Sequence, residues 1–348
     1  MKVSELGEFG LIARLADALA AQTAAGRLVL GIGDDAAVWR TDSGALLCTT
    51  DTLVAGVHFL PERLPAGRQV HPWRDLGWKA LAVNVSDVAA MGGTPEIALV
   101  TLALPEDTEV EAIDELYKGL AEAGEAYGIA IAGGDIVRSP TTTISVALIG
   151  RTEVDADGEP VVLRRDAAQA GDLIAVTGRL GGAAGGLHVL REGEAGANAA
   201  QPLIERHFRP QARLQAGKAA LAAGIRCAID VSDGLLQDLG HICQASSLGA
   251  VVWRDKLPID SALIQLFEPE EALQCAVAGG EDYELLLIGG QEQLEAAGRE
   301  AGVPVTVIGD MVIDAQQEAK LLDEGGREVP LASTGWDHLQ PGPSGKET

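Results

Sequence analysis

Two adjacent carboxylates lie among glycines and small apolar residues in the stretch Leu30-Gly31-Ile32-Gly33-Asp34-Asp35-Ala36-Ala37. Neighbouring charges of the same sign repel by ~1 to 4 kcal/mol at close range, so the pair is either solvated or bridged by a cation. Taken alone, the stretch is equally well explained by a solvated turn, because Gly and Asp are common turn residues. Acidic residues recur, however, in short loops that contain Gly or Ser, and this recurrence favours a cation site: Asp51, Asp87, Asp135, Asp230, Asp233 and Glu281.

The same stretch also fits the G-x-G-x-x-A pattern of dinucleotide-binding proteins. In those proteins the glycines open a helix whose N-terminal amides bind a pyrophosphate. Here two carboxylates would face the phosphates, and the following residues predict a strand, a turn at Asp42-Ser43-Gly44 and a second strand. The sequence therefore argues against a dinucleotide site.

Composition limits the class of protein and its partners. The 348 residues are enough for about two domains with buried cores, and 43 glycines without a collagen-like period indicate many tight loops. A formal net charge of −25 argues against nucleic acid or an anionic membrane as a partner. Small anionic ligands remain compatible with this charge if metal ions reverse the local field.

The cysteines and the N-terminal region predict a cytoplasmic location. Cys48, Cys227, Cys243 and Cys275 are dispersed and include no C-x-x-C pair, which is typical of free thiols in a reducing cytosol. The apolar region near the N-terminus contains several charges, unlike a signal peptide. No apolar run approaches the ~20 residues of a membrane-spanning helix.

Hydrophobic periodicity predicts strands and helices in both halves of the chain, and hence an α/β or α+β fold. A long helix is expected over residues 73–91. The second strand after the Asp pair is expected over residues 45–50, with Asp51 at its end, and residues 129–132 are expected to form a short buried strand that ends in Gly133-Gly134-Asp135.

The segment Asp155-Ala156-Asp157-Gly158 is the best candidate for a domain boundary. It predicts an N-terminal domain over residues 1–154 and a C-terminal α/β domain over residues 155–340. The last residues, 341–348, are rich in Pro, Gly and polar side chains and are expected to be a disordered tail.

The acidic loops each follow a short apolar run: Asp34-Asp35, Asp51, Asp135, and Asp230 with Asp233. Each alone is more often a cap or a turn, and Asp233 is a candidate N-cap for the helix that follows it. Together they offer only oxygen ligands, which favour Mg²⁺ over zinc or copper. The sequence contains no P-loop, no H-E-x-x-H and no G-x-S-x-G pattern.

Six segments follow one another in a distinctive order: Gly31–Ala37 (GIGDDAA), Thr50–Phe59 (TDTLVAGVHF), Asn84–Gly92 (NVSDVAAMG), Gly133–Asp135 (GGD), Asp230–Leu235 (DVSDGL) and Gly279–Leu285 (GGEDYEL). Together they resemble the motifs of the thiamine-monophosphate kinase family, a member of the superfamily typified by aminoimidazole ribonucleotide synthetase. The resemblance runs from about Gly7 to His338. Its second and last segments are specific to the kinase, whereas the Asp-rich loops are shared more widely.

This resemblance implies two α/β domains of the aminoimidazole ribonucleotide synthetase-like fold, and a homodimer whose N-terminal sheets join across the two-fold axis. It implies ATP-dependent phosphorylation of thiamine phosphate to thiamine diphosphate, with metal and ATP binding and dimerisation in the N-terminal domain. By matched position, several Mg²⁺ ions would be held by Asp35, Thr49, Thr50, Asp51, Asp87, Asp135, Asp230 and Asp233. ATP, the phosphoryl donor, would contact Gly134, Asp135, Arg165 and Ser232, and thiamine phosphate would contact His58, Glu281 and Trp336. Asp51, Asp135 and Asp233 would be catalytic.

One departure from the family is Ile136-Val137, where Thr is common, so hydroxyl contacts expected there are missing. Because no His, Ser or Cys stands out as an activated nucleophile, direct in-line transfer without a phosphoenzyme is expected. Two alternatives remain open. One keeps the fold but changes the acceptor, as in a selenophosphate or purine-intermediate synthetase; the other is a non-catalytic protein that binds Mg-nucleotide or thiamine phosphate.

Overall fold

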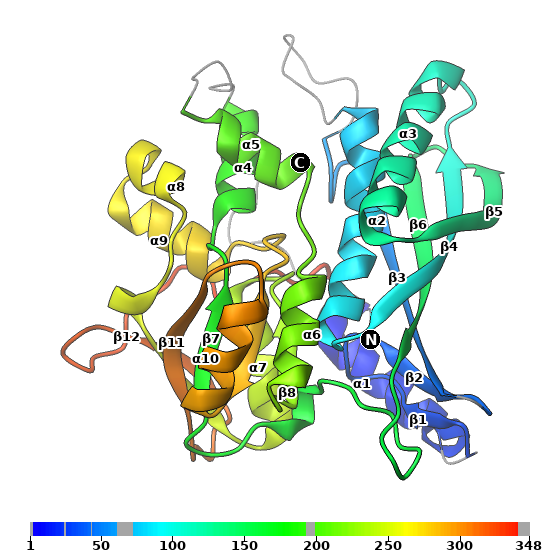
Figure 1. Cartoon of the computed structure of the whole chain (residues 1–348). Helices are drawn as coiled ribbons and strands as arrows, with labels where there is room; N and C mark the ends of the chain where they lie inside the picture. The colour runs from blue at the N-terminus through cyan, green and yellow to red at the C-terminus, as the bar shows by residue number, and fades with distance from the viewer. Residues whose placement is uncertain (1–2, 24–25, 43, 61–71, 193–198, 340–348) are drawn as a thin grey trace.

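The computed structural model describes residues 3–23, 26–42, 44–60, 72–192 and 199–339. The predicted tail at 341–348 lies outside these residues. Two six-stranded sheets form the framework, and helices pack against both (Figure 1). The mixed α/β class expected from the sequence is confirmed.

The first sheet has the strand order β1-β2-β3-β6-β4-β5. Its neighbouring strands are antiparallel except β4 and β5, which are parallel. Helices α2 (Trp73–Ala90) and α3 (Val110–Tyr127) cover one face of the sheet and complete its apolar core (Figure 1). The strands are β1 (Leu28–Leu30), β2 (Ala37–Arg40), β3 (Ala45–Val54), β4 (Thr94–Leu104), β5 (Ala130–Arg138) and β6 (Thr143–Thr152).

The second sheet has the order β12-β9-β11-β7-β10-β8, antiparallel except for β12 and β9. Its strands are β7 (Leu173–Thr177), β8 (Cys227–Asp230), β9 (Gly249–Trp253), β10 (Leu285–Gly289), β11 (Val305–Val312) and β12 (Ala319–Leu322). Strand β10 is buried along its whole length, and its alternate residues enter two different apolar clusters. This sheet is therefore covered on both faces, which suits its continuous apolar strands.

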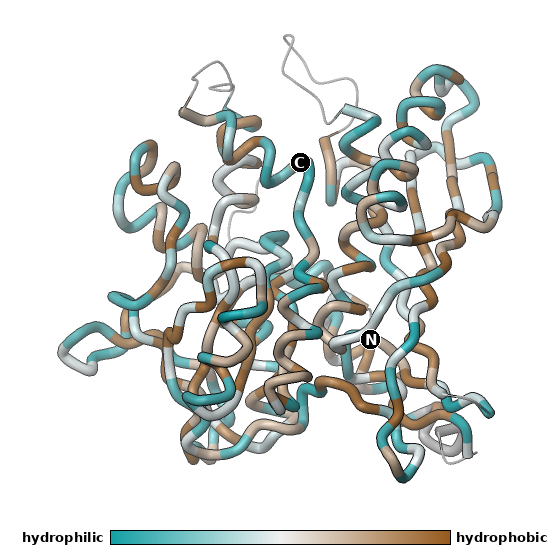
Figure 2. The backbone as a smooth tube through the Cα atoms, in the orientation of Figure 1, coloured by the Kyte–Doolittle hydropathy of each residue, from teal (hydrophilic) through white to brown (hydrophobic). Residues whose placement is uncertain are grey.

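The remaining helices complete the two layers. They are α1 (Val3–Thr23), α4 (Gly182–Glu192), α5 (Gln201–Phe208), α6 (Leu214–Ala222), α7 (Leu235–Ser246), α8 (Ser261–Leu266), α9 (Pro269–Ala278) and α10 (Gln291–Glu300). Figure 2 shows hydrophobic stretches along the strands of both sheets and hydrophilic residues in the peripheral loops. None of the described helices combines the length and the apolar character needed to cross a membrane.

Helix α2 lies where the two halves meet. It packs on the first sheet and α3, and it also contacts α6 and β8 of the second half. Every residue from Leu76 to Ser86 is buried, so the helix has no solvated face. Three polar side chains in this run, Lys79, Asn84 and Ser86, are fully buried, and buried polar groups need partners. Their partners lead directly to the candidate site.

Two strands differ from the sequence prediction. Strand β3 does not end at Thr50 but continues to Val54, paired with β6 throughout, because a threonine- and valine-rich run favours extended backbone. The predicted short buried strand at 129–132 is wrong: β5 runs from Ala130 to Arg138, is mostly exposed and pairs with β4 alone. Pairing with β4 extends β5 through both glycines and through Asp135.

Candidate active site

Three carboxylates from distant parts of the chain converge at the meeting point of the two halves. Asp35 lies between β1 and β2, Asp87 lies on α2, and Asp230 ends β8. One carboxylate oxygen of each lies within 4.8 Å of the others. Three of the acidic segments therefore lie together, and we call Asp35, Asp87 and Asp230 the carboxylate cluster.

Buried hydroxyl and amide groups support the carboxylate cluster. The hydroxyl of Ser86 donates to Asp230 Oδ2 at 2.5 Å, and the hydroxyl of Thr49 donates to Asp87 Oδ2. Asn84 accepts the backbone N–H of Asp51 at 3.0 Å, which ties β3 to α2. These contacts explain the polar residues on the buried face of α2.

Burial and mutual repulsion make the cluster reluctant to ionise. Burial, together with the charge of Asp35, raises the pKa of Asp230 to about 8. The pKa of Asp87 is raised well above its ordinary value by burial and by the charges of Asp51 and Asp230. The pKa of Asp51 rises to about 6, chiefly because of burial, so Asp51 belongs to the same electrostatic group.

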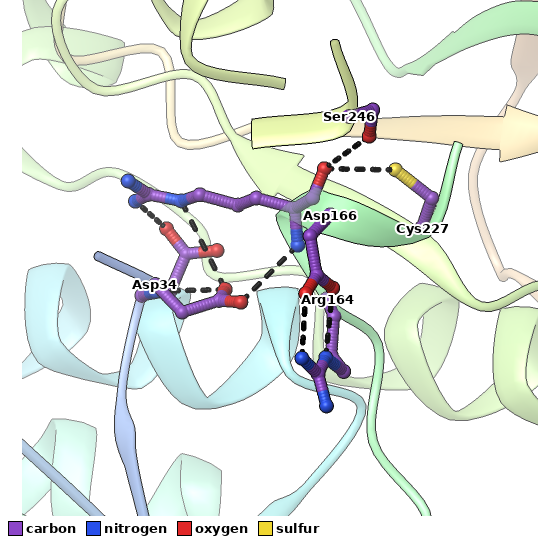
Figure 3. A network of polar contacts seen from close by, with 7 residues as sticks. Asp34, Arg164, Asp166, Cys227 and Ser246 are labelled. Atoms are coloured by element: carbon purple, nitrogen blue, oxygen red, sulfur yellow. Dashed lines mark hydrogen bonds and ion pairs between the residues drawn. The ribbon is translucent and has the colours of Figure 1, made fainter. Parts of the chain in front are cut away.

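Arg165 supplies positive charge at the edge of the cluster. Its guanidinium donates to Asp35, and its backbone N–H donates to Asp34 Oδ2 at 3.2 Å. Its carbonyl accepts hydrogen bonds from Ser246 Oγ at 2.8 Å and Cys227 Sγ at 3.8 Å, as Figure 3 shows. Both ends of Arg165 are thus fixed, and the side chain reaches into the acidic region.

The donor set fits a divalent cation. Asp35 Oδ2 is buried and has no hydrogen-bond partner among the described residues, although such an oxygen normally has one. Two oxygens bound to the same Mg²⁺ at about 2.1 Å are at most about 4.2 Å apart, close to the spacing in the cluster. Carboxylates that repel one another, one of them with an oxygen that has no donor within the described part of the chain, are the ligands that a hard cation prefers.

A pocket of about 420 Å³ adjoins the cluster through Asp51. Its wall includes residues from β3, the β8–α7 loop, the segment after α9 and the C-terminal segment. The lining residues used below are Glu8, Asp51, His58, Ser232, Asp233, Glu281, Tyr283 and Trp336. The structure therefore brings His58, Glu281 and Trp336, the three residues predicted to bind the substrate, into one pocket together with Asp51, Asp233 and Ser232.

The aromatic part of the pocket is held by local hydrogen bonds. His58 Nδ1 accepts the backbone N–H of Val54 at 3.1 Å, and burial with the neighbouring His338 lowers the pKa of His58 to about 4. The ring is neutral at pH 7, so its Nε2 carries the hydrogen. Trp336 donates its indole N–H to His338 Nδ1 at 3.0 Å and its backbone N–H to the carbonyl of Asp233 at 3.1 Å.

Some predicted site residues lie elsewhere. Asp135 is exposed on the edge strand β5 and is not part of the carboxylate cluster. Gly134 lies beside it, where a Cβ would fall 1.7 Å from the carbonyl oxygen of Val100, so close strand packing alone requires glycine there. The hydroxyl of Thr50 donates to the carbonyl of Val146 on the exposed side of β3, because alternate strand residues face opposite sides.

Sequence reasoning missed Asp238 and misassigned the cap of α7. The N-cap residue is Gly234, and no side chain caps it. Instead, Asp238 in the first turn accepts the backbone N–H groups of Ser232, Asp233 and Gly234 at 3.0, 3.1 and 3.0 Å. Its place in the first turn of the predicted helix, five residues after Asp233, was the available signal.

Lys79 is the second residue that sequence reasoning left without a role. Its ammonium group lies 2.6 Å from Glu281 Oε1, and His207 Nδ1 lies 3.2 Å from Glu281 Oε2. Glu281 is therefore in an ion pair at the back of the pocket. A single lysine inside a long and mostly apolar helix was the signal that could have identified it.

Comparisons with known proteins agree with this geometry. Residues 33–152 match the AIR synthase related protein, N-terminal domain, and residues 169–321 match the AIR synthase related protein, C-terminal domain. Thiamine-monophosphate kinase from Escherichia coli K12 is 40% identical over 339 residues, covering 96% of this chain and 98% of that protein. Its counterpart from Bacillus subtilis 168 is 33% identical, covering 89% and 94%.

Solved structures of similar proteins agree with these sequence comparisons. The structure of AaThiL complexed with AMPPCP and TMP has a TM-score of 0.82 at 35% identity and covers 97% of this chain and 99% of that chain. A hydrogenase maturation protein HypE, at 19% identity and a TM-score of 0.65, shares the fold alone. On its matched domains, full-length relatives and ordered motifs, this chain belongs to the thiamine-monophosphate kinase family.

Proposed function

We propose that this protein transfers the γ-phosphoryl group of ATP to thiamine phosphate and so forms thiamine diphosphate. The observation that carries the proposal is that Asp51, which interacts with Asp87 of the carboxylate cluster, also lines the pocket containing His58, Glu281 and Trp336. Further support comes from relatives that are named thiamine-monophosphate kinase and from the similar AaThiL complexed with AMPPCP and TMP.

Both reactants are phosphates, so their mutual repulsion is the main obstacle to transfer. Asp35, Asp87 and Asp230, with Thr49, Asp51 and Asp233, would hold Mg²⁺ in this proposal. Bound Mg²⁺ would supply charge neutralisation and orientation for an in-line displacement. The guanidinium of Arg165, which pairs with Asp35 here, and Ser232 on the pocket wall are the groups proposed to contact ATP.

The pocket would bind the acceptor. Neutral His58 offers an Nε2–H donor, and the half-exposed ring of Trp336 offers a face for a planar ring, worth ~0.5 to 2 kcal/mol for a cationic one. Tyr283, Asp51 and Asp233 complete the wall towards the carboxylate cluster. These residues position the acceptor for direct attack on ATP, and no enzyme nucleophile is required.

We also propose a homodimer in which the N-terminal sheets join. The first sheet carries exposed apolar residues on its face away from α2, among them Ile97 and Leu99, and along its edge strand β5, at Ile136 and Val137, and contiguous exposed apolar surface favours association. Such a dimer would let the Gly134–Asp135 segment of one subunit serve the site of the other. The proposed division into domains at 1–154 and 155–340, and a cytoplasmic location inferred from the free thiols, complete this description.

One assay tests the proposed reaction. ADP release should require both thiamine phosphate and Mg²⁺, and mass spectrometry should identify thiamine diphosphate as the product. ADP release with selenide or a purine intermediate in place of thiamine phosphate would support the alternative synthetases. Tight binding of both ligands without turnover would support the non-catalytic alternative, and stable labelling of the protein by γ-labelled ATP would contradict direct transfer.

A further inference from the structure

Two buried side chains from different helices contact the Glu281 carboxylate on the side away from the pocket. Lys79 on α2 and His207 on α5 are 0% and 1% exposed. Lys79 Nζ lies 2.6 Å from Glu281 Oε1, and His207 Nδ1 lies 3.2 Å from Glu281 Oε2. Lys79 also donates to the carbonyl of His58 at 3.3 Å, so one ammonium group supports two residues of the pocket wall.

The backbone of Glu281 is fixed as well. Its φ angle of 68° lies in the left-handed region, which is unfavourable for a residue with a side chain. Its N–H donates to the carbonyl of Ser232 at 2.8 Å. At the preceding Gly280, a Cβ would fall 2.3 Å from that same carbonyl oxygen. The loop is thus pressed against Ser232, and the Glu281 carboxylate has a defined position.

The ion pair determines which kind of interaction the Glu281 carboxylate can make with a ligand. Although burial alone would raise it, Lys79 and His207 hold the pKa of Glu281 well below its ordinary value, so the side chain accepts hydrogen bonds and donates none. Each carboxylate oxygen keeps a second lone-pair direction, and the side chain is 22% exposed at the pocket. Its charge, however, is already balanced by an ammonium group 2.6 Å away, which would also repel a second cation.

Thiamine phosphate has two groups that a carboxylate could meet: the cationic thiazolium ring and the amino group of the neutral aminopyrimidine. A carboxylate that is paired with Lys79 gains little from a further cation but still accepts a hydrogen bond from a neutral donor. Glu8 lines the same pocket and remains available for the thiazolium charge.

We propose that Lys79 and His207 are positioning residues that hold Glu281 so that it accepts a hydrogen bond from the aminopyrimidine amino group of thiamine phosphate, and not an ion pair from the thiazolium. This inference rests on the proposed function and names the part of the substrate that Glu281 recognises. It also assigns Lys79 a role in substrate selection that is distinct from metal or ATP binding.

The first test uses equilibrium binding to decide whether Glu281 contacts the thiazolium ring or the aminopyrimidine of the substrate. Calorimetry would compare thiamine phosphate with a neutral isostere in which carbon replaces the thiazolium nitrogen, using wild-type protein and Glu281→Gln. The variant should weaken both ligands by the same factor, about 10- to 100-fold, as expected for losing a hydrogen bond to a charged group. Weakening confined to the cationic ligand would overturn the proposal.

The second test addresses Lys79 through selectivity. Wild type should prefer thiamine phosphate to its 4-oxo analogue, which lacks the amino donor, by about 10-fold or more in kcat/KM. Lys79→Met should narrow this preference and raise KM for thiamine phosphate, while KM for ATP stays within about twofold. Lys118→Met, which removes an exposed lysine on α3, is the matched control and should change neither quantity.

Lys79→Met removes the ammonium partner of Glu281, leaves its largely buried carboxylate with His207 alone, and is expected to be less stable. The double variant Lys79→Met/Glu281→Gln replaces the pair by neutral side chains of similar size, so it keeps the selectivity measurement possible if the single variant does not fold. Unchanged selectivity in the double variant would contradict the inference. Failure of the wild type to phosphorylate thiamine phosphate would instead contradict the proposed function, so the two failures are distinguishable.

Discussion

At the scale of single residues, Asp87 has the most demanding environment. It is flanked by Asp51 and Asp230, its pKa is raised well above the ordinary value, and its direct support is the hydroxyl of Thr49. A residue placed for stability alone would not be surrounded by like charges. Such an arrangement is typical of functional sites.

Asp87→Asn is expected to lower kcat by at least about 100-fold, because metal-based stabilisation worth several kcal/mol is lost. The free energy of unfolding of the metal-free protein should stay the same or increase, because one repulsive charge is removed. Steady-state kinetics and urea denaturation in the presence of a chelator measure these two quantities. Asp157→Asn, in an exposed turn, is the control, and equal activity of both variants would contradict the assignment.

The resemblance to the kinase family grouped Asp35, Asp87 and Asp230 as metal ligands, and these three side chains lie together in the structure. The apolar runs beside them indicated only that their elements are buried. The sequence did not predict the position of Thr50, since a resemblance between motifs does not reveal which side of a strand faces the site. The partners of Lys79 could not be predicted from the sequence either. Glu281 and His207 are distant in the sequence and meet only in the tertiary structure.

At the scale of secondary structure, the β8–α7 loop depends on one carboxylate. Asp238 accepts the N–H groups of Ser232, Asp233 and Gly234 and thereby shapes the segment that lines the pocket. Helix α2 was predicted to within one residue because its length and apolar content are local properties. The ends of β3 and β5 were not, because pairing with neighbouring strands determines where they stop.

Asp238→Ala should lower the free energy of unfolding by about 2 to 4 kcal/mol, because buried backbone donors lose their acceptor. Asp233→Ala, five residues away, should leave stability nearly unchanged but lower activity, since its proposed role is in metal binding. Chemical denaturation and turnover assays on the two variants provide the comparison. If Asp238→Ala proved as stable as wild type, the loop would have to be held by other contacts.

At the scale of the whole molecule, the exposed apolar residues of the first sheet and of its edge strand β5 predict association. Ile136→Asp on β5 should yield a monomer in size-exclusion chromatography with light scattering, because a charge in an apolar interface is costly to bury. Ile264→Asp on α8 is the matched control, since Ile136 and Ile264 are 66% and 64% exposed. A dimer that survives Ile136→Asp, or a wild-type monomer, would count against the joined sheets.

The acidic cluster also predicts how stability depends on pH. The pKa values of Asp230, Asp51 and Asp34 are raised to about 8, 6 and 7, above their unfolded values near 4. The folded, metal-free protein therefore binds more protons than the unfolded chain over this range. Its stability should fall as the pH rises towards 8.

At lower pH, buried histidines change the stability of the folded protein in the opposite direction. Burial lowers the pKa values of His58 and His241 to about 4, so these rings cost stability as the pH falls from about 6.5 to 4. The useful window is therefore about pH 7.5 to 8.5, where both rings are mostly neutral in the folded and the unfolded states.

Within this window Tm of the metal-free protein should decrease with increasing pH, while the increase in Tm caused by Mg²⁺ should grow. The reason is that protons and Mg²⁺ compete for the same carboxylates. Thermal melts with a chelator and with excess Mg²⁺ at several pH values measure the difference. Asp87→Asn should flatten the pH dependence and shrink the Mg²⁺ effect together. A Mg²⁺ effect that is independent of pH in wild type would place the metal away from the buried carboxylates.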